Sequence, residues 1–264
     1  MVPVQLMESM ELSRLEFDVV WQHLGLGAFP TVFRMLGHGR TEDERRRLTD
    51  QAWQSLSARG LGRHGAAHPM LVELLTVLSR PEREVDARMN HGELAVRALA
   101  GARDQLAAIG VLRAGTFRLW EITPGGLSRA VVALLPEHPA GGGISVTLPS
   151  GLFAAACAVS GDDPARLRAA LAERGAREPD AEQLATAFTG ITGAGQFGAA
   201  RLDRLGRRQR AGHVVGFVDS AGGRYLLDAS PPAPGGGQWT TIAPTDSVRL
   251  AGQISRLLAE AAGG

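Results

Sequence analysis

A strand, a proline and an apolar helical stripe follow one another twice in this chain. The strand-like segments are residues 117–122 and 239–242, and each passes Pro124 or Pro244 before the stripe begins. The residues of the two stripes have the same spacing: Leu127, Val131, Leu134 and Leu135, and Leu250, Ile254, Leu257 and Leu258. This spacing places them on one face of an α-helix. We predict a paired, pseudo-twofold architecture; the alternative is that a common pattern has arisen twice by chance.

Composition places the chain among globular proteins and excludes several other classes. With 264 residues, of which 44% are hydrophobic, it can bury a sizeable core. All 28 basic residues are arginines, and the formal net charge is only +1. Such a balance provides no broad positive field for a polyanion, so no nucleic-acid partner is expected. The absence of lysine also excludes a P-loop, whose lysine contacts phosphates.

The sequence also bears on the compartment. Residues 1–11 have neither the basic start nor the apolar core of a signal peptide, and the chain has no run of about 18 apolar residues. Cys157 is the only cysteine and lies in an apolar stretch, so an intrachain disulfide is impossible and a buried, unreactive thiol is expected. We predict a cytoplasmic protein without membrane insertion.

Helices and strands occur in blocks along the first half. Residues 15–21 are predicted to form a strand. Thr41 and Glu44 have the spacing of a capping box, and the helix that they begin should end at Gly60. A second helix follows Pro69. The strands predicted after it are residues 84–89, which alternate as a half-buried strand does, and residues 106–112 and 117–122.

The second half follows the glycines at 141–143 and repeats this order of blocks. An extended segment, 144–148, leads into helices. Asp163 is a good cap for one helix, and Asp180 begins another that should reach Ile191. The strands expected next are residues 197–201, 214–218 and 225–227.

These blocks predict an α+β fold. The short turns between the predicted strands favour antiparallel pairing. We expect a single domain over residues 1–264, with quasi-repeat halves of about 12–140 and 144–262.

One glycine motif resembles a cofactor site. Residues 193–198 match G-x-G-x-x-G. A dinucleotide fingerprint needs a strand before it and a helix after it, and the predicted order here is reversed. Termination of the preceding helix is the better interpretation, and no cofactor is predicted.

Two further pairs of residues fit structural roles better than chemical ones. His64 and His68 have the spacing of zinc ligands on a helix, but they lie in a loop-like stretch. Asp162 and Asp163 precede a proline and are predicted to cap a helix rather than act as acid and base. No catalytic or metal site is therefore predicted.

Six stretches carry a family resemblance through their order along the chain. They are Leu-Gly-Leu-Gly-Ala-Phe-Pro at 24–30, Ser-Leu-Ser-Ala-Arg-Gly-Leu at 55–61, Ser-Arg-Pro-Glu-Arg-Glu-Val-Asp-Ala-Arg at 79–88, Gly-Gln-Phe-Gly at 195–198, Gly-Gly-Arg-Tyr-Leu at 222–226 and the segment 239–249. In these stretches the chain resembles the EspG family of type VII secretion-associated chaperones. The resemblance implies a central antiparallel sheet flanked by two helical bundles, with an internal pseudo-twofold relation. It also implies a cytosolic chaperone without catalytic activity, which binds PE-PPE-like protein pairs and covers an apolar tip of the PPE partner.

The resemblance further implies a partner surface made of the sheet, the loops between strands and the C-terminal bundle. We therefore expect partner contacts around residues 100–104 and 197–210. The candidate partner-binding residues are Ala100, Gly101, Arg103, Asp104, Gln196, Phe197, Arg201, Arg208 and Arg210.

Purely structural roles are open to the same residues. Core packing is the commoner role for a residue such as Phe197, and a solvated hairpin edge protected by charge is the commoner explanation for the arginines. Two more classes of function also stay open: a ligand-binding enzyme that uses the Gly193 loop, and a regulatory protein that binds nucleic acid through its arginines.

Overall fold

The computed structural model describes residues 9–35, 37–229 and 237–261. The chain divides into two compact units. Unit 1 consists of Met1–Ala87, Leu94–Val131 and Arg201–Arg208, and unit 2 of Arg88–Glu93, Val132–Ala200 and Gln209–Gly264. The fold class is α+β with a large antiparallel sheet, as predicted. None of the described helices is long and apolar enough to cross a membrane.

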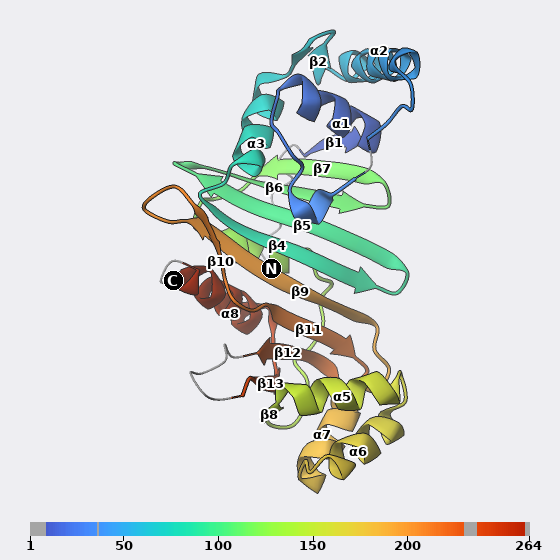
Figure 1. Cartoon of the computed structure of the whole chain (residues 1–264), viewed down its shortest axis with the longest axis vertical. Helices are drawn as coiled ribbons and strands as arrows, with labels where there is room; N and C mark the ends of the chain where they lie inside the picture. The colour runs from blue at the N-terminus through green and yellow to red at the C-terminus, as the bar shows by residue number, and fades with distance from the viewer. Residues whose placement is uncertain (1–8, 36, 230–236, 262–264) are drawn as a thin grey trace. The chain divides into compact units, whose positions relative to one another are not determined.

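Unit 1 starts with a short strand, continues with three α-helices and a meander of strands, and then has the short helix α4 (Figure 1). Its elements are β1 (Met10–Ser13), α1 (Arg14–His23), the 3-10 helix η1 (Thr31–Phe33), α2 (Glu42–Ala58), β2 (Gly62–Arg63), β3 (Ala66–Ala67), α3 (Pro69–Ser79), β4 (Arg83–His91), β5 (Leu94–Arg103), β6 (Leu106–Arg113), β7 (Thr116–Glu121) and α4 (Leu127–Val132). The sheet strands lie in the order β1-β7-β6-β5-β4, so β1 pairs with the last strand of the meander. β2 and β3 form a separate two-stranded ribbon.

The core of unit 1 contains a cluster of aromatic rings. Phe17 of α1 stacks on Phe117 of β7 with ring centroids 4.0 Å apart, and Phe33 of η1 meets Phe117 edge-on at 5.0 Å. Trp21 is buried beside Phe17 and donates a hydrogen bond from Nε1 to the Gly27 carbonyl oxygen at 2.9 Å. Stacked and edge-on rings of this kind add stabilisation beyond their buried area.

The strand predicted at residues 15–21 is wrong, because α1 occupies this segment. Ser13 Oγ accepts from the Glu16 N–H at 3.2 Å, and the Glu16 carboxylate accepts from the Ser13 N–H at 2.7 Å. This reciprocal capping box begins a helix whose buried residues Phe17, Val20 and Trp21 have helical spacing. The cap signal outweighs the strand propensity of the valines and aromatic rings.

The two helices predicted next are confirmed. Thr41 caps α2 by accepting from the Glu44 N–H at 3.2 Å, and α3 begins at Pro69. β4 is a strand as predicted, but it is not half-buried, since Glu84 and Asp86 are buried as well. β5 was not predicted: its alanine-rich segment lacks the alternation of a strand with one exposed face.

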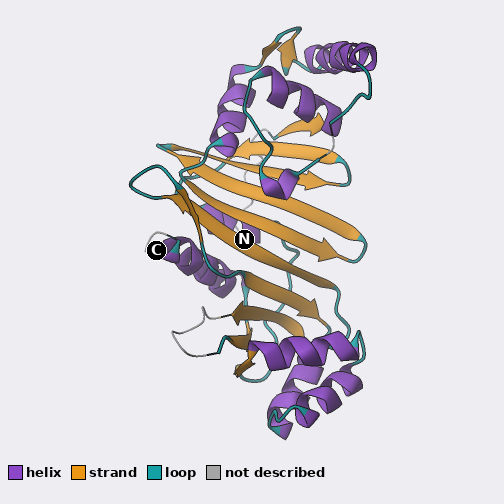
Figure 2. Ribbon diagram, in the orientation of Figure 1, coloured by secondary structure: helices purple, strands orange, loops and turns teal. Residues whose placement is uncertain are grey.

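Unit 2, like unit 1, is built of helices and sheet strands (Figure 2). Its blocks follow the same order along the chain as those of unit 1. Its elements are β8 (Val146–Pro149), α5 (Ser150–Ser160), α6 (Pro164–Glu173), α7 (Glu178–Ala187), β9 (Gly193–Leu202), β10 (Arg208–Arg210), β11 (Val215–Ser220), β12 (Gly223–Ala229), β13 (Trp239–Pro244) and α8 (Ser247–Glu260). Its strands lie in the order β9-β11-β12-β13-β8. The core beside α6 and α7 includes Val146, Leu148, Leu171, Leu184 and Ile242.

Most of the predicted elements of unit 2 are confirmed, with different ends. Asp163 caps α6, accepting from the N–H groups of residues 165 and 166. α7 begins at Glu178 rather than Asp180, and Ile191 lies beyond it with a side chain 46% exposed. Cys157 is only partly buried, and burial raises the pKa of its thiol, which makes the reactive thiolate scarcer.

The main elements of the two units are connected in the same order. A short strand (β1 or β8) leads into three helices, a four-strand meander and a last helix (α4 or α8), and the short strand pairs with the end of the meander. The predicted helical stripe of residues 250–258 lies in α8, but α4 ends at Val132, so Leu134 and Leu135 lie beyond the helix that the first copy was expected to form. The twofold relation itself stays a prediction.

Candidate functional site

Two predicted partner segments meet at the start of β4 in unit 1. Glu82 donates its N–H to the Ala102 carbonyl oxygen at 2.9 Å, and its own carbonyl oxygen accepts from the Leu202 N–H at 2.8 Å. Its carboxylate also accepts from the Asp104 N–H at 3.3 Å. Glu82 therefore places the β5–β6 turn next to the β9–β10 hairpin (Figure 1). We call residues 103–106 and 203–207 the hairpin tips.

Asp203 fixes the shape of the β9–β10 tip. Its Oδ1 accepts from the N–H groups of Leu205 and Arg207, each at 2.8 Å, and its Oδ2 accepts from Arg207 Nε at 3.0 Å. Gly206 has φ +73°, a left-handed conformation that favours glycine. The carboxylate thus satisfies the turn's amides, as aspartate does in Asx-turns, and leaves Leu205 at the end of the hairpin.

Both tips expose a large apolar side chain. Leu205 is 76% exposed and Leu106 is 42% exposed. Arginines lie around them: Arg103 is 46% exposed, and the half-exposed Arg208 forms an ion pair with the buried Glu84. Exposed apolar groups within a polar rim are typical of interaction surfaces.

The remaining predicted residues of unit 1 differ in their exposure. Ala100 is fully buried, and Gly101 lies beneath the surface, where a Cβ would come within 3.0 Å of Pro81. Arg201 near the end of β9 is half-buried. Ala100 and Gly101 therefore support the turn from beneath, whereas Arg103, Asp104 and Arg201 reach solvent.

The other candidates lie in unit 2. Gln196 on β9 and Arg210 on β10 are exposed. Phe197 is fully buried, and its ring packs against Phe217 with centroids 5.8 Å apart. This burial agrees with the alternative that Phe197 is a core residue. Phe197 can therefore affect partner binding only indirectly, by positioning its exposed neighbours on β9.

The G-x-G-x-x-G match lies within a strand. β9 runs through residues 193–202, so no helix follows the glycines to receive a pyrophosphate. A Cβ at Gly195 would lie 2.6 Å from the Arg88 carbonyl oxygen, and one at Gly193 would lie 2.4 Å from the His91 ring. The glycines permit close approach of neighbouring groups. The expected helix termination occurs earlier: α7 ends at Ala187, and Gly190 has φ +63°.

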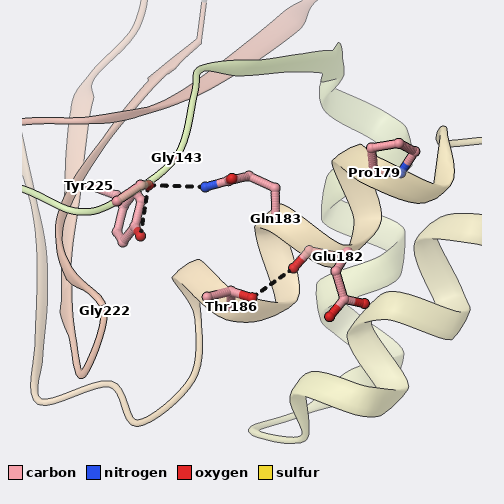
Figure 3. A pocket seen from close by; sticks show the side chains of 8 residues that line it. Gly143, Pro179, Glu182, Gln183, Thr186, Gly222 and Tyr225 are labelled. Atoms are coloured by element: carbon pink, nitrogen blue, oxygen red, sulfur yellow. Dashed lines mark hydrogen bonds between the residues drawn. The ribbon is translucent and has the colours of Figure 1, made fainter.

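A pocket of about 480 Å³ lies in unit 2 beside α7 (Figure 3). Tyr225 Oη and Gln183 Nε2 both donate to the Gly142 carbonyl oxygen, at 3.2 and 3.1 Å. Glu182, also in the lining, accepts from Arg168 at 3.2 Å. The side chains in this pocket form an ordinary hydrogen-bonded lining and present no nucleophile beside a base.

Unit 2 contains a buried ion pair that the sequence analysis did not predict. Arg224 donates from Nε and Nη2 to the two Asp219 carboxylate oxygens at 2.6 and 2.8 Å, and both side chains are at most 1% exposed. Arg224 also donates to the Pro136 carbonyl oxygen and to Ser247 Oγ, and His91 Nε2 lies 3.4 Å from Asp219 Oδ2. This cluster joins two strands to the start of α8. No local pattern marks a lone arginine in a strand as the centre of such a network.

Among the described residues, no group of three or more His, Cys, Asp and Glu side chains is placed to hold a metal ion. His64 contacts Asp50 at 3.2 Å, and His68 is the N-cap of α3. The two histidines are therefore not on one helical face. Asp163 serves as a helix cap, as predicted.

Comparisons with known proteins agree with the fold. A model of the EspG family matches residues 13–256. A solved structure of the Mycobacterium tuberculosis type VII secretion system chaperone EspG5, in complex with a PE25-PPE41 dimer, is similar over 96% of this chain and 96% of its own. The TM-score is 0.75 and the sequence identity is 15%, so this likeness shows a common fold. None of the curated proteins matches the chain.

Proposed function

The chain belongs to the EspG family, and from this premise we propose that it is a cytosolic secretion chaperone that binds a PE-PPE-like protein pair and keeps it soluble for export. The observation that carries the proposal is the common fold over 96% of both chains with EspG5, whose structure contains a PE25-PPE41 dimer. A chaperone of this kind binds and releases without chemistry, so no catalytic role is assigned to any residue.

The physical task is to cover an apolar end of the client. An exposed apolar patch of a few hundred Å² promotes aggregation, and a complementary surface removes it from water. The proposed contacts are the solvent-facing members of the predicted set: Arg103, Asp104, Gln196, Arg201, Arg208 and Arg210. Their side chains supply charge and hydrogen bonds of the sort found at interface rims, which allow release as well as binding.

The buried members of the set have a supporting part in this proposal. Gly101 lets the end of β5 lie close to Pro81, Ala100 is buried beside it in β5, and Phe197 packs β9 against Phe217. Substitution of these residues would act on client binding through the backbone positions of their exposed neighbours.

Reconstitution tests the proposal. A PE-PPE-like pair encoded in the same genome is produced alone and with this chain, and soluble yield and elution volume are compared. We expect the pair to aggregate alone and to elute with the chain as one stoichiometric complex. A pair that is equally soluble without the chain, and that elutes separately from it, would contradict the proposal.

A further inference from the structure

The outer edge of β8 in unit 2 is open. β8 is the last strand in the order β9-β11-β12-β13-β8, so only one of its two sides pairs within the sheet (Figure 1). Thr147 lies opposite Thr241, and the Ser150 N–H donates to the Gln238 carbonyl oxygen at 2.8 Å. Because hydrogen-bonded and non-hydrogen-bonded pairs alternate along an antiparallel ladder, the N–H and carbonyl groups of Thr147 point away from β13. Among the residues that the structure describes, none pairs with these two groups.

In unit 1 the corresponding edge is closed by an arginine. β1, like β8, is a strand of four residues in which buried and exposed positions alternate, and Glu11 is its second residue as Thr147 is the second of β8. Arg59 donates from Nη1 to the Glu11 carbonyl oxygen at 2.7 Å and from Nη2 to the Glu16 carboxylate at 2.6 Å. The Arg59 guanidinium therefore occupies the acceptor that an added strand would use.

The arginine of unit 2 that has the place of Arg59 does not cover β8. α2 and α6 end in the same way: Arg59 and Arg174 are their C-cap residues, and each is followed by a glycine with positive φ, +71° at Gly60 and +92° at Gly175. Arg174, however, donates from Nη1 to the Ala170 carbonyl oxygen of its own helix at 2.9 Å. The same helix end thus occurs twice, and its arginine closes only one of the two strand edges.

A pocket of about 320 Å³ adjoins the open edge. Its lining comes from β8, the first turn of α5, the end of the α6–α7 loop and α7, and its apolar residues include Leu148, Leu152, Ala176 and Leu184. Arg177 and Asp180 are also in the lining, and Arg177 donates to both carboxylate oxygens of Asp180 at 2.7 and 2.9 Å. The two charges compensate each other, so the pocket suits an uncharged apolar side chain.

Open backbone groups beside an apolar pocket are the features of a site for strand addition. An extended polypeptide supplies the N–H and carbonyl groups that an open strand edge lacks, and alternate side chains face one side, so that one of them can enter a pocket. A second copy of this chain suits the edge less well, because β8 has only four residues, whereas a stable interface between folded proteins takes about 20–30 residues on each side. A linear segment of another protein is therefore the occupant that the edge and the pocket select together.

We propose that β8 binds an extended segment of a partner protein by strand addition. The N–H and carbonyl groups of Thr147 pair with the backbone of the segment, and a leucine or phenylalanine side chain of the segment enters the pocket. This inference does not rest on the proposed function, whose contacts lie on β5, β9, β10 and their turns. Its test uses this chain and peptides alone, so the two can fail separately.

Peptide binding tests the inference. Seven-residue peptides with a fixed central leucine or phenylalanine and random flanking residues are displayed and selected on the full-length chain, and the selected peptides are measured by fluorescence anisotropy. We expect them to bind, and replacement of the central residue by serine to weaken binding about tenfold.

Two substitutions of Thr147 examine the backbone pairing. Thr147→Pro removes the outward N–H and leaves the pairs with β13 intact, since proline is tolerated in an edge strand where its nitrogen faces solvent. It should weaken peptide binding about tenfold. Thr147→Val is the matched control, because it keeps the N–H and loses only the hydroxyl, which lies 2.9 Å from the Thr241 hydroxyl. It should bind like the wild type.

Filling the pocket provides a second readout that decides the matter if Thr147→Pro does not fold. Ala176→Leu places a leucine where the equivalent helix end of unit 1 has Leu61, and it should weaken binding about tenfold with an unchanged melting temperature. Ala154→Leu on the exposed side of α5 should bind like the wild type.

Three results would overturn the inference. The first is that no selected peptide binds, and the second is that Ala176→Leu or a folded Thr147→Pro binds as well as its control. The third is a dimer of the chain in analytical ultracentrifugation that Ala176→Leu dissociates, because the edge would then belong to a second copy.

Discussion

Arg224 and Asp219 form a two-pronged ion pair in the interior of unit 2, with N···O distances of 2.6 and 2.8 Å and almost no solvent exposure of either side chain. The Arg224 guanidinium also lies 5.7 Å from the centre of the Phe217 ring. Taking both charges out of water is costly, and the pair persists because hydrogen bonds within the cluster satisfy its charged groups.

Removal of one partner should be strongly destabilising. Arg224→Met leaves the Asp219 carboxylate buried without its counter-charge, so we expect the free energy of unfolding to fall by about 3–5 kcal/mol. Urea denaturation measures this change. Arg249→Met serves as the control, because the Arg249 side chain is 72% exposed and its ion pair with Asp246 is solvated. Equal midpoints for the two variants would show that the buried pair has no special role.

The decrease in the free energy of unfolding at acidic pH should depend on Glu16. Burial raises the pKa of this carboxyl, but hydrogen bonds from the Ser13 backbone, Ser55 and Arg59 together lower the pKa by more than burial raises it. The net pKa therefore lies below 4.5. A depressed pKa means that the folded state favours the carboxylate. Its contribution is present above the unfolded pKa and disappears as the pH falls through the folded value.

Glu16→Gln removes this contribution. We expect the variant to be less stable than the wild type at neutral pH by about 1–2 kcal/mol, because its hydrogen bonds are weaker. The difference in unfolding free energy between the two proteins should narrow as the pH falls below the ordinary pKa of 4.5. Urea denaturation at a series of pH values measures the gap, and Glu73→Gln on the exposed side of α3 is the control. A gap that stays constant with pH would show that titration of Glu16 is not involved.

How far the sequence predicts this structure depends on whether a signal is local. Thr41, Pro69 and Asp163 were correctly identified as helix starts, because a cap acts through the next few residues alone. β5 was missed because its residues 98–102 are small and buried and follow one another with no polar residue between them. The Arg224 network could not be predicted either, since its partners come from segments far apart in the chain.

The candidate site, too, was predictable only where its sequence signals are local. The strand predicted at residues 197–201 lies within β9, which the structure continues into a hairpin turn at Leu205-Gly206. That this hairpin lies beside residues 103–106 depends on Glu82, which no sequence pattern connects to either segment. Burial of Phe197 and Ala100 likewise follows from strand pairing rather than from their own sequence context.

Gly195 should tolerate no side chain. A Cβ there would lie 2.6 Å from the Arg88 carbonyl oxygen and 2.8 Å from the Phe217 ring, and the backbone group cannot rotate away. We expect Gly195→Ala to lower the free energy of unfolding by about 1–3 kcal/mol. Gly252→Ala is the opposite control: α8 has open space at this position, and alanine should stabilise the helix by about 0.5–1 kcal/mol. Thermal melts of the two variants should shift in opposite directions, and a neutral Gly195→Ala would refute the close-approach argument.

The exposed arginines should affect the rate of client binding more than the lifetime of the complex. Arg103 and Arg201 reach solvent, so replacement by alanine removes rim charges without leaving a buried group unpaired. We expect Arg103→Ala/Arg201→Ala to slow association with a PE-PPE-like pair about tenfold at low salt and to change dissociation little. Surface plasmon resonance at two salt concentrations resolves both rates. Arg256→Ala, on the exposed face of α8, should leave both rates unchanged. If the double variant associates like the wild type while the complex itself forms, the client contacts lie elsewhere on the fold, and the chaperone function stands without this surface.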